Sequence, residues 1–153
     1  MRCSNVGVIS DTHGLLREQV KDRLRGCDLI IHAGDVGHPS VLDELREIAE
    51  VTAVRGNVDG GGWARALGLI EYMEVDHSCI CVVHDVHTLD IDPVAAQVNV
   101  IVHGHSHQPG IAYKDGVLYL NPGSAGPRRF GLPISMAWLH IGPDGVVPEL
   151  LEV

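Results

Sequence analysis

The order of the predicted elements is the feature that most constrains how this chain can fold. Short β-branched runs alternate with amphipathic segments at first, and after that almost only strands follow. The first elements are predicted strands at 5–10, 28–33 and 51–55 and predicted helices at 15–25 and 40–49. Further strands are predicted at 69–75, 78–83, 98–102, 111–114, 117–120, 135–141 and 146–151. A βαβαβ start followed by antiparallel hairpins predicts an α/β (α+β) fold of two packed sheets flanked by helices, rather than one doubly wound sheet.

Several predictions concern the ends of these elements. Ser40 follows Pro39 and is expected to cap the second helix. The glycine-rich run at 56–62 interrupts regular structure after the third strand and predicts a loop. Asp115 and Gly116 predict a tight turn between the two strands that flank them.

Length and charge limit the classes of function. A chain of 153 residues has the size of one ordinary domain, so we expect a single domain over residues 1–153. A net charge of −9 argues against the broad basic surface that bulk nucleic-acid binding needs. Two Trp, three Tyr and one Phe are too few for the base-stacking platforms of single-strand binders. A free nucleotide or another small phosphoester remains open as a substrate.

The expected location is the cytoplasm. No apolar run approaches the roughly 18 residues of a membrane span, and the start of the chain lacks a long apolar stretch with a cleavage site. The four cysteines are scattered without a CxxC pair, which argues against a zinc finger or a disulfide scaffold. The sequence is compatible with a monomer or with a homo-oligomer.

Residues of metal-binding type stand directly after five of the predicted strands. They are Asp11 with His13, Asp35, Asn57, His84, and the histidines of the run from His103 to His107. Open α/β sheets place their sites at the carboxyl ends of strands. In an extended chain, side chains two residues apart lie on one side at about 6 to 7 Å, so Asp11 and His13 are expected to converge. The same spacing places His103, His105 and His107 on one side and does not tell which two of them bind.

The mixture of carboxylate, amide and imidazole groups favours a particular class of ion. Such a set suits Mn, Fe, Zn or Ni better than an all-oxygen site or a thiolate site, and we expect Mn. Seven candidate ligands exceed the needs of one ion, and a carboxylate such as Asp35 can bridge two ions about 3.5 to 4 Å apart. With two carboxylates and a hydroxide, two divalent ions leave a charge of about +1 that attracts an anion.

The motifs in their order resemble a known family. They are Asp-Thr-His at 11–13, Gly-Asp at 34–35, Gly-Asn-Val-Asp at 56–59, His84, Gly-His-Ser-His at 104–107 and Asn-Pro-Gly-Ser at 121–124. This set is similar to that of the calcineurin-like metallophosphoesterases, and most similar to their small prokaryotic YfcE-like branch. The resemblance covers residues 5–141. It implies a four-layer αββα sandwich.

The resemblance also implies roles for single residues. One ion would be held by Asp11, His13 and His107, the other by Asn57, His84 and His105, with Asp35 as the bridge. The implied activity is hydrolysis of phosphodiesters or phosphomonoesters by a hydroxide held between two divalent ions.

The sequence departs from the family pattern at two positions. Val58 stands where many larger members have a histidine near the leaving group, which weakens the case for a dedicated general acid. Asp85 stands where the branch often has glycine. It is either a hydrogen-bond partner of the site or an unrelated surface carboxylate.

Simpler interpretations apply to other polar residues. We expect structural roles for the remaining histidines, which are His32, His38, His77, His87, His103 and His140. His38 is also a candidate for lining the substrate cleft, because it follows Asp35 in a predicted loop. Arg128 and Arg129 are either solvated charges or include a phosphate contact, for which we choose Arg128.

Two other function classes remain open at this stage. One is a protein-binding scaffold, because the retromer subunit that shares the fold works chiefly in that way. The other is a single structural metal site, which would bind an ion without hydrolysis. All seven candidate positions carry residue types that can bind metal, and this favours the enzyme.

Overall fold

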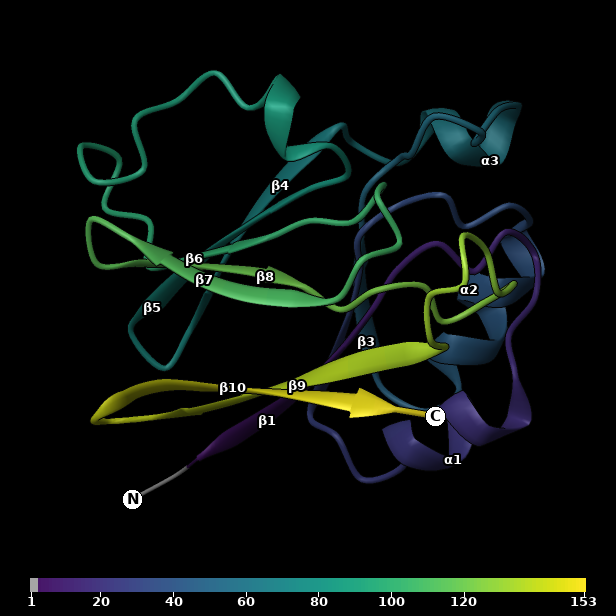
Figure 1. The fold of residues 1–153 in the computed structure, drawn as a ribbon, viewed down its shortest axis with the longest axis horizontal. Coiled ribbons are helices and arrows are strands. Elements are labelled where there is room, and N and C mark those ends of the chain that lie inside the picture. The colour runs from purple at the N-terminus through teal and green to yellow at the C-terminus, as the bar shows by residue number, and fades with distance from the viewer. Residues whose placement is uncertain (1–2) are drawn as a thin grey trace.

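The computed structural model describes residues 3–153, and its strands form two mixed five-stranded sheets (Figure 1). The first sheet has the order β10-β9-β1-β2-β3, in which β1, β2 and β3 are parallel and β9 and β10 are antiparallel to their neighbours. Its strands are β1 (Ser4–Ile9), β2 (Leu29–His32), β3 (Glu50–Ala53), β9 (Ser135–Gly142) and β10 (Gly145–Glu152).

The second sheet has the order β4-β5-β6-β8-β7. Its central strands β5, β6 and β8 are parallel, and hairpins add β4 and β7 at the edges. The predicted turn at Asp115 and Gly116 is confirmed, since both residues have positive φ between β7 and β8. The strands are β4 (Ile70–Val75), β5 (Ser78–Val83), β6 (Val100–Val102), β7 (Gly110–Lys114) and β8 (Val117–Asn121).

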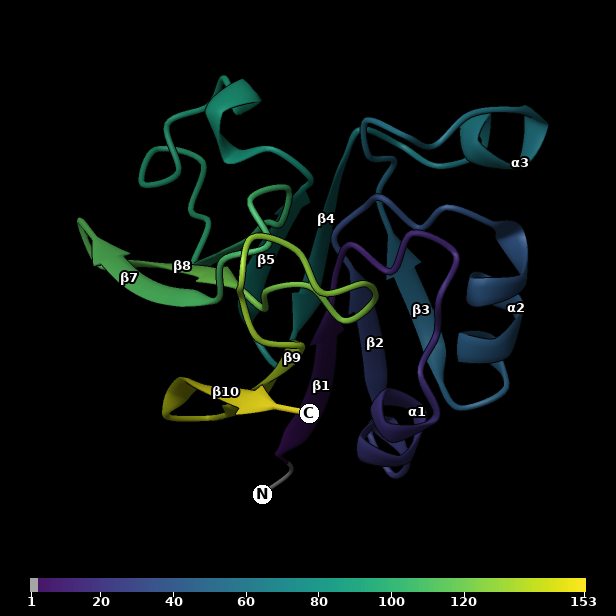
Figure 2. The ribbon, with the colours of Figure 1, turned by 45° about the vertical axis from the view of Figure 1, so that its right-hand side comes forward.

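Two helices cover the outer face of the first sheet (Figure 2). They are α1 (Glu18–Leu24) and α2 (Pro39–Arg46). Leu24 of α1 and Leu45 of α2 are fully buried in one cluster with Ile30 of β2. Gly7 makes room for this packing, because a Cβ there would collide with the Leu24 side chain.

The main core lies between the two sheets. Alternate residues of the strands point into it, such as Val6 and Val8 of β1, while the neighbouring Ile9 points toward the helices. Val82 and Leu120 come from the second sheet into the same core. Burial of these branched side chains holds the sheets face to face and fixes which strand ends meet.

The outer face of the second sheet is covered without an α-helix. Residues 84–98 run over it and contain only the 3-10 helix η1 (Val86–Thr88). Val86, Leu89 and Ile91 of this segment pack against the cluster around Ile101. The predicted α/β sandwich of two packed sheets is confirmed, with helices over the first sheet and a mostly irregular outer layer over the second.

Several element ends differ from the prediction. The first helix begins at Glu18 rather than at residue 15, and the loop at 56–62 leads into a short helix, α3 (Gly62–Arg65). The cap of α2 is His38 rather than Ser40, because Pro39 fits the first helical position and His38 Nδ1 accepts the Ser40 N–H at 3.1 Å. Among the described residues, no helix has the length and apolar character needed to cross a membrane.

Candidate metal centre

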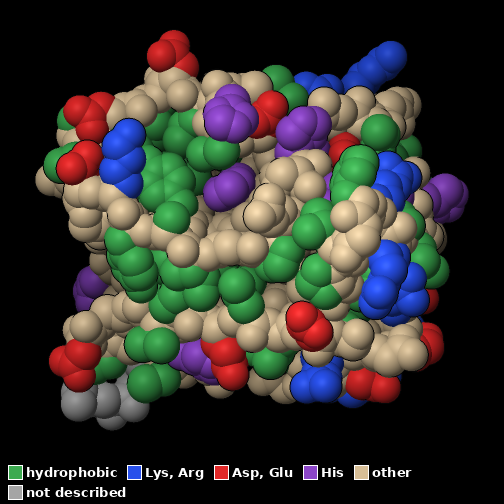
Figure 3. All heavy atoms as spheres, in the orientation of Figure 1, with side chains coloured by type: hydrophobic (Ala, Val, Ile, Leu, Met, Phe, Trp, Pro, Cys, Tyr) green, Lys and Arg blue, Asp and Glu red, His purple; other side chains and the backbone are tan. Residues whose placement is uncertain are grey.

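Two groups of side chains meet at the carboxyl ends of the strands. Asp11, His13 and His107 form the first group, and Asp35, His84 and His105 form the second. Within each group, one donor atom from each residue lies within 4.8 Å of the others. Figure 3 shows histidine side chains gathered around an acidic side chain in the upper half of the face that it draws.

Asp35 lies between the two groups. Its Oδ2 is 3.2 Å from Nε2 of His84 and 3.7 Å from Nε2 of His13. Oδ1 of Asp11 is 3.4 Å from Nε2 of His107 and 4.0 Å from Nε2 of His84. The two groups therefore form one continuous cluster, in which Asp35 makes the shortest approaches that join a carboxylate to histidines of both groups.

Buried atoms without hydrogen-bond partners test whether this cluster fits metal ions. Asp11 Oδ1 and His84 Nε2 are buried, and neither makes a hydrogen bond in the described structure. An unpaired buried polar atom costs about 1 to 3 kcal/mol, so such atoms normally have a partner. Divalent ions would supply one, and the oxygen and imidazole donors suit transition metals. The residues present thus fit divalent metal ions.

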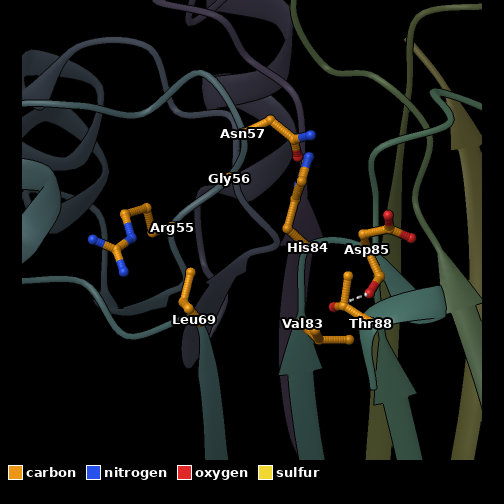
Figure 4. A pocket seen from close by; sticks show the side chains of 8 residues that line it. All are labelled: Arg55, Gly56, Asn57, Leu69, Val83, His84, Asp85 and Thr88. Carbon is orange, nitrogen blue, oxygen red and sulfur yellow. Dashed lines mark hydrogen bonds between the residues drawn. The ribbon is translucent and has the colours of Figure 1, made fainter. Parts of the chain in front are cut away.

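Asn57 stands at the exposed side of the second group. With His84 it lines a cavity of about 220 Å³ between the two sheets, and Figure 4 shows its side chain pointing toward the His84 ring. Gly56 allows this placement, because a Cβ there would collide with the backbone nitrogen and Oδ1 of Asp35. The amide of Asn57 is therefore available to an ion held by His84 and Asp35.

The backbone at the cluster is left-handed at five residues. The φ angles are 56° at Asp11, 47° at His13, 54° at Asp35, 73° at His105 and 64° at His107. Such a conformation costs about 1 to 3 kcal/mol per residue and is typical of functional sites. Asp11 and His13 converge, as expected, but not through strand alternation, since β1 ends at Ile9.

Hydrogen bonds hold these strained residues. The N–H of Asp11 donates to Gly34 O at 3.0 Å, and the N–H of His13 donates to Asp35 O at 2.9 Å. The N–H of His105 donates to Oδ2 of Asp11 at 3.1 Å. Each loop of the cluster is therefore tied to another, and the positions of the donor atoms depend on all of them.

The three histidines of the run 103–107 separate. The strand β6 ends at Val102, and the loop then sends His105 to the second group and His107 to the first. His103 belongs to neither group and lines a different cavity with Gln108 and Tyr119. Spacing alone did not tell which two of the three would approach the other candidate ligands; in the structure these are His105 and His107, both with left-handed backbone.

The surroundings shift the pKa values of the two carboxylates in opposite directions. Burial raises the pKa of Asp11. Burial acts in the same direction on Asp35, but His84 and the Val58 N–H outweigh it and lower the Asp35 pKa. Burial lowers the pKa values of His13 and His107, and this favours the neutral imidazole that binds metal.

Asp59 is a site residue whose role sequence reasoning missed. Its carboxylate is buried and accepts the N–H groups of Val36 at 3.2 Å, Gly37 at 2.9 Å and Gly56 at 2.9 Å. It thereby joins the loop after Asp35 to the loop that carries Asn57. Its place in the Gly-Asn-Val-Asp motif was the only signal in the sequence.

His32 and Thr12 form a second buried link. His32 Nδ1 accepts the Gly34 N–H at 3.1 Å, and its Nε2 lies 3.0 Å from Oγ1 of Thr12, which donates to Val36 O at 2.9 Å. Because Nδ1 accepts, Nε2 carries the proton. This confirms a structural role for His32, which burial keeps neutral by lowering its pKa to about 4.

We expect His32 to make the metal-free fold sensitive to acid. In the unfolded chain histidine takes up a proton near pH 6.5, but in the fold it does so only near its pKa of about 4. The unfolded state thus binds more protons between these values, and the free energy of unfolding falls by up to about 3 kcal/mol as the pH drops. Urea titrations at pH 7 and pH 4.5 measure the change. His32→Gln, which does not titrate, should lose less stability than the natural chain; equal losses would contradict this account.

The remaining predicted residues lie around the cluster. His38 is exposed and serves as the cap of α2, so its substrate role remains a prediction. Asp85 caps η1 through the His87 N–H at 3.0 Å, and its Oδ2 is 3.9 Å from Nε2 of His105. Arg128 and Arg129 are both exposed. Of the two arginines, Arg129 is the one whose charge contributes to the low pKa values of His13 and His107.

Comparison with known proteins agrees with this geometry. A family model described as the calcineurin-like phosphoesterase superfamily domain matches residues 5–144. A probable metallophosphoesterase of Methanocaldococcus jannaschii is 37% identical over 132 residues, covering 78% of this chain and 67% of that protein. One of Methanothermobacter thermautotrophicus is 33% identical over 163 aligned positions, covering 96% and 91%.

A solved structure shows the same fold at lower identity. Vacuolar protein sorting 29 from Cryptosporidium parvum superposes with a TM-score of 0.84 at 19% identity, covering 99% of this chain and 92% of that one. The family resemblance drawn from the motifs is confirmed by the match over residues 5–144. The chain belongs to the calcineurin-like phosphoesterase superfamily.

Proposed function

We propose that this protein hydrolyses small phosphoesters, either diesters or monoesters, with two divalent ions, of which Mn²⁺ is the first choice and Ni²⁺, Fe²⁺ and Zn²⁺ are alternatives. The observation that carries the proposal is the position of Asp35, whose carboxylate faces both groups. When bound, the ions would supply a hydroxide as the nucleophile and would neutralise charge on the phosphoryl group. Small relatives named as probable metallophosphoesterases support the same activity.

Each residue of the cluster has a role in this proposal. Asp11, His13 and His107 hold one ion, and Asn57, His84 and His105 hold the other, with Asp35 as the bridge. Asp11 and His107 are buried, so the first site is the more enclosed one. Asn57 and His105 are exposed, so the second site opens toward the substrate.

Val58 limits how the leaving group is protonated. Its side chain is 58% exposed and has no ionisable group. Residue 58 therefore supplies no general acid, and the proposal assigns leaving-group protonation to water. Esters with good leaving groups should accordingly react fastest, because they need the least help from an acid.

The competing candidate is a protein-binding scaffold on the same fold. The likeness to vacuolar protein sorting 29 favours it, since the fold alone does not distinguish the two functions. The complete set of metal-binding side chains favours hydrolysis instead, because a scaffold has no need for strained, unpaired ligands.

The test is metal-dependent turnover. We expect chelated protein to be inactive and refilled protein to hydrolyse bis(p-nitrophenyl) phosphate or p-nitrophenyl phosphate, with Mn²⁺ giving the highest rate. Release of p-nitrophenolate by chelated, refilled and untreated protein measures this, and the relative rates decide between diester and monoester. If fully loaded protein turned over neither ester, the scaffold function would replace the proposed hydrolysis.

A further inference from the structure

The single phenylalanine of the chain has an unusual position. Phe130 is 82% exposed, although phenylalanine is among the residues that are most often buried. Its φ is 57°, a left-handed conformation that is a genuine outlier for a bulky side chain. An exposed ring on strained backbone contributes little to stability, and its position therefore suggests another use.

The loop that carries Phe130 is fastened to the metal centre. Ser124 Oγ donates to the carbonyl of Asp11 at 3.1 Å, and the Ala125 N–H donates to Ser10 O at 3.0 Å. Gly126 lies so close to Thr12 that a Cβ would collide with its carbonyl. The root of the loop is thus fixed against the residues around Asp11, and Figure 2 shows the loop in yellow-green before β9.

The ring of Phe130 stands at the edge of the first group. Its centroid is 6.0 Å from that of His107, with the ring planes at 79°. Because Phe130 is mostly exposed, it offers a flat apolar surface beside the metal centre. The loop turns back after it through a hydrogen bond from the Leu132 N–H to Arg129 O at 3.0 Å.

Arg129 adds a positive charge to the same loop. Arg129 directly precedes Phe130 in the chain, and its side chain is exposed. The same loop therefore offers an exposed aromatic ring and an exposed guanidinium. An aromatic ring and a guanidinium at one edge of the site match a ligand that joins a flat ring to a phosphate.

We propose that Phe130 stacks on a planar aromatic substituent of the phosphoester while Arg129 contacts a phosphoryl oxygen. The substrate is then an ester of a nucleoside or of an aromatic alcohol. This inference rests on the proposed function. A nucleic-acid polymer is a poor candidate because the net charge is −9 and one ring beside the site cannot stack successive bases.

Three diesters with one leaving group test this assignment. They are the p-nitrophenyl esters of thymidine 5′-phosphate, phenyl phosphate and methyl phosphate, which differ only in the retained group. We expect the Mn²⁺-loaded protein to have a higher kcat/KM for the thymidine and phenyl esters than for the methyl ester. In Phe130→Ala the ratio of these kcat/KM values should fall about tenfold. Phe130→Tyr should keep the preference for a planar group. Phe130→Leu should lose it, because leucine is apolar but has no π face. The thymidine and phenyl esters distinguish a nucleoside from a simple aromatic.

Calorimetry makes the outcome independent of turnover. We expect Phe130→Ala to weaken binding of thymidine 5′-phosphate by about tenfold and to leave binding of methyl phosphate unchanged. Loss of turnover on all three esters in loaded natural protein would overturn the proposed function but leave the binding result to decide the role of Phe130. Unchanged preference and unchanged binding in Phe130→Ala would overturn the inference while hydrolysis persists. A variant that changed only sedimentation would also overturn it and make Phe130 a contact between copies of the chain.

Discussion

Asp35→Asn is expected to reduce the metal content from two ions to one or none and to lower turnover by about 10³-fold or more. The amide cannot offer two anionic oxygens, so it cannot bridge two ions, and stabilisation by two metals is worth several kcal/mol. Asparagine tolerates the φ of 54° at this position and can still accept the Val58 N–H. The loss should therefore reflect the bridge rather than the fold. Elemental analysis after gel filtration, together with p-nitrophenolate release, measures both effects.

His103→Ala is the matched control for this variant. His103 stands in the same histidine-rich run but belongs to neither group, so metal content should stay near that of the natural chain. Two ions retained in Asp35→Asn would contradict the bridging role. Ions lost from His103→Ala would show that the ligands of this run have been assigned to the wrong residues.

The overall architecture could be predicted because it depends on local patterns. The β-branched runs and the four-residue apolar period of the first helix describe buried faces, and these are the faces that Val8, Leu24 and Leu45 occupy. The irregular cover of the second sheet could not be predicted in this way. Residues 84–98 have no helical period, and their place depends on the cluster around Ile101.

The candidate site could be predicted as a set of residue types, but not in its geometry. Strand ends brought Asp11 and Asp35 together, because the parallel strands β1 and β2 deliver their carboxyl ends to one edge of the first sheet. His84 follows β5 of the second sheet, so the packing of the two sheets brings it to the same place. Strand alternation gave the wrong reason for the approach of Asp11 and His13. Their left-handed backbone depends on hydrogen bonds to residues 34 and 35, which no single stretch of sequence reveals.

Asp59 illustrates a role that only tertiary structure shows. A carboxylate in a glycine-rich loop most often caps a turn, and that interpretation would predict no effect on metal binding. In the structure the same side chain receives three backbone N–H groups from two different loops. One loop carries Asp35 and the other carries Asn57, so the carboxylate constrains the distance between the proposed bridge and a proposed ligand of the second ion.

Asp59→Ala is therefore expected to weaken binding of the second ion by about 10- to 100-fold, the usual effect of removing a group that orients metal ligands. The first ion should be weakened less than the second, because no hydrogen bond of Asp59 reaches Asp11, His13 or His107 directly. Stepwise calorimetric titration of the metal-free protein with Mn²⁺ separates the two affinities, and urea unfolding at neutral pH records the accompanying loss of stability.

Asp28→Ala provides the comparison that separates support of the fold from positioning of the metal. Asp28 accepts the Asn5 N–H at 2.8 Å near the amino ends of β1 and β2, opposite the metal centre, so its loss removes a carboxylate bond to backbone without touching either group. Equal metal affinities in Asp28→Ala and the natural chain, with a weaker second ion in Asp59→Ala alone, would support the positioning role. If Asp59→Ala lowered the free energy of unfolding but kept both affinities, the carboxylate would only stabilise the loops. If both ions weakened together, the two groups would depend on the loop as one unit, and the separate roles of Asp35 and Asn57 in the second site would need revision.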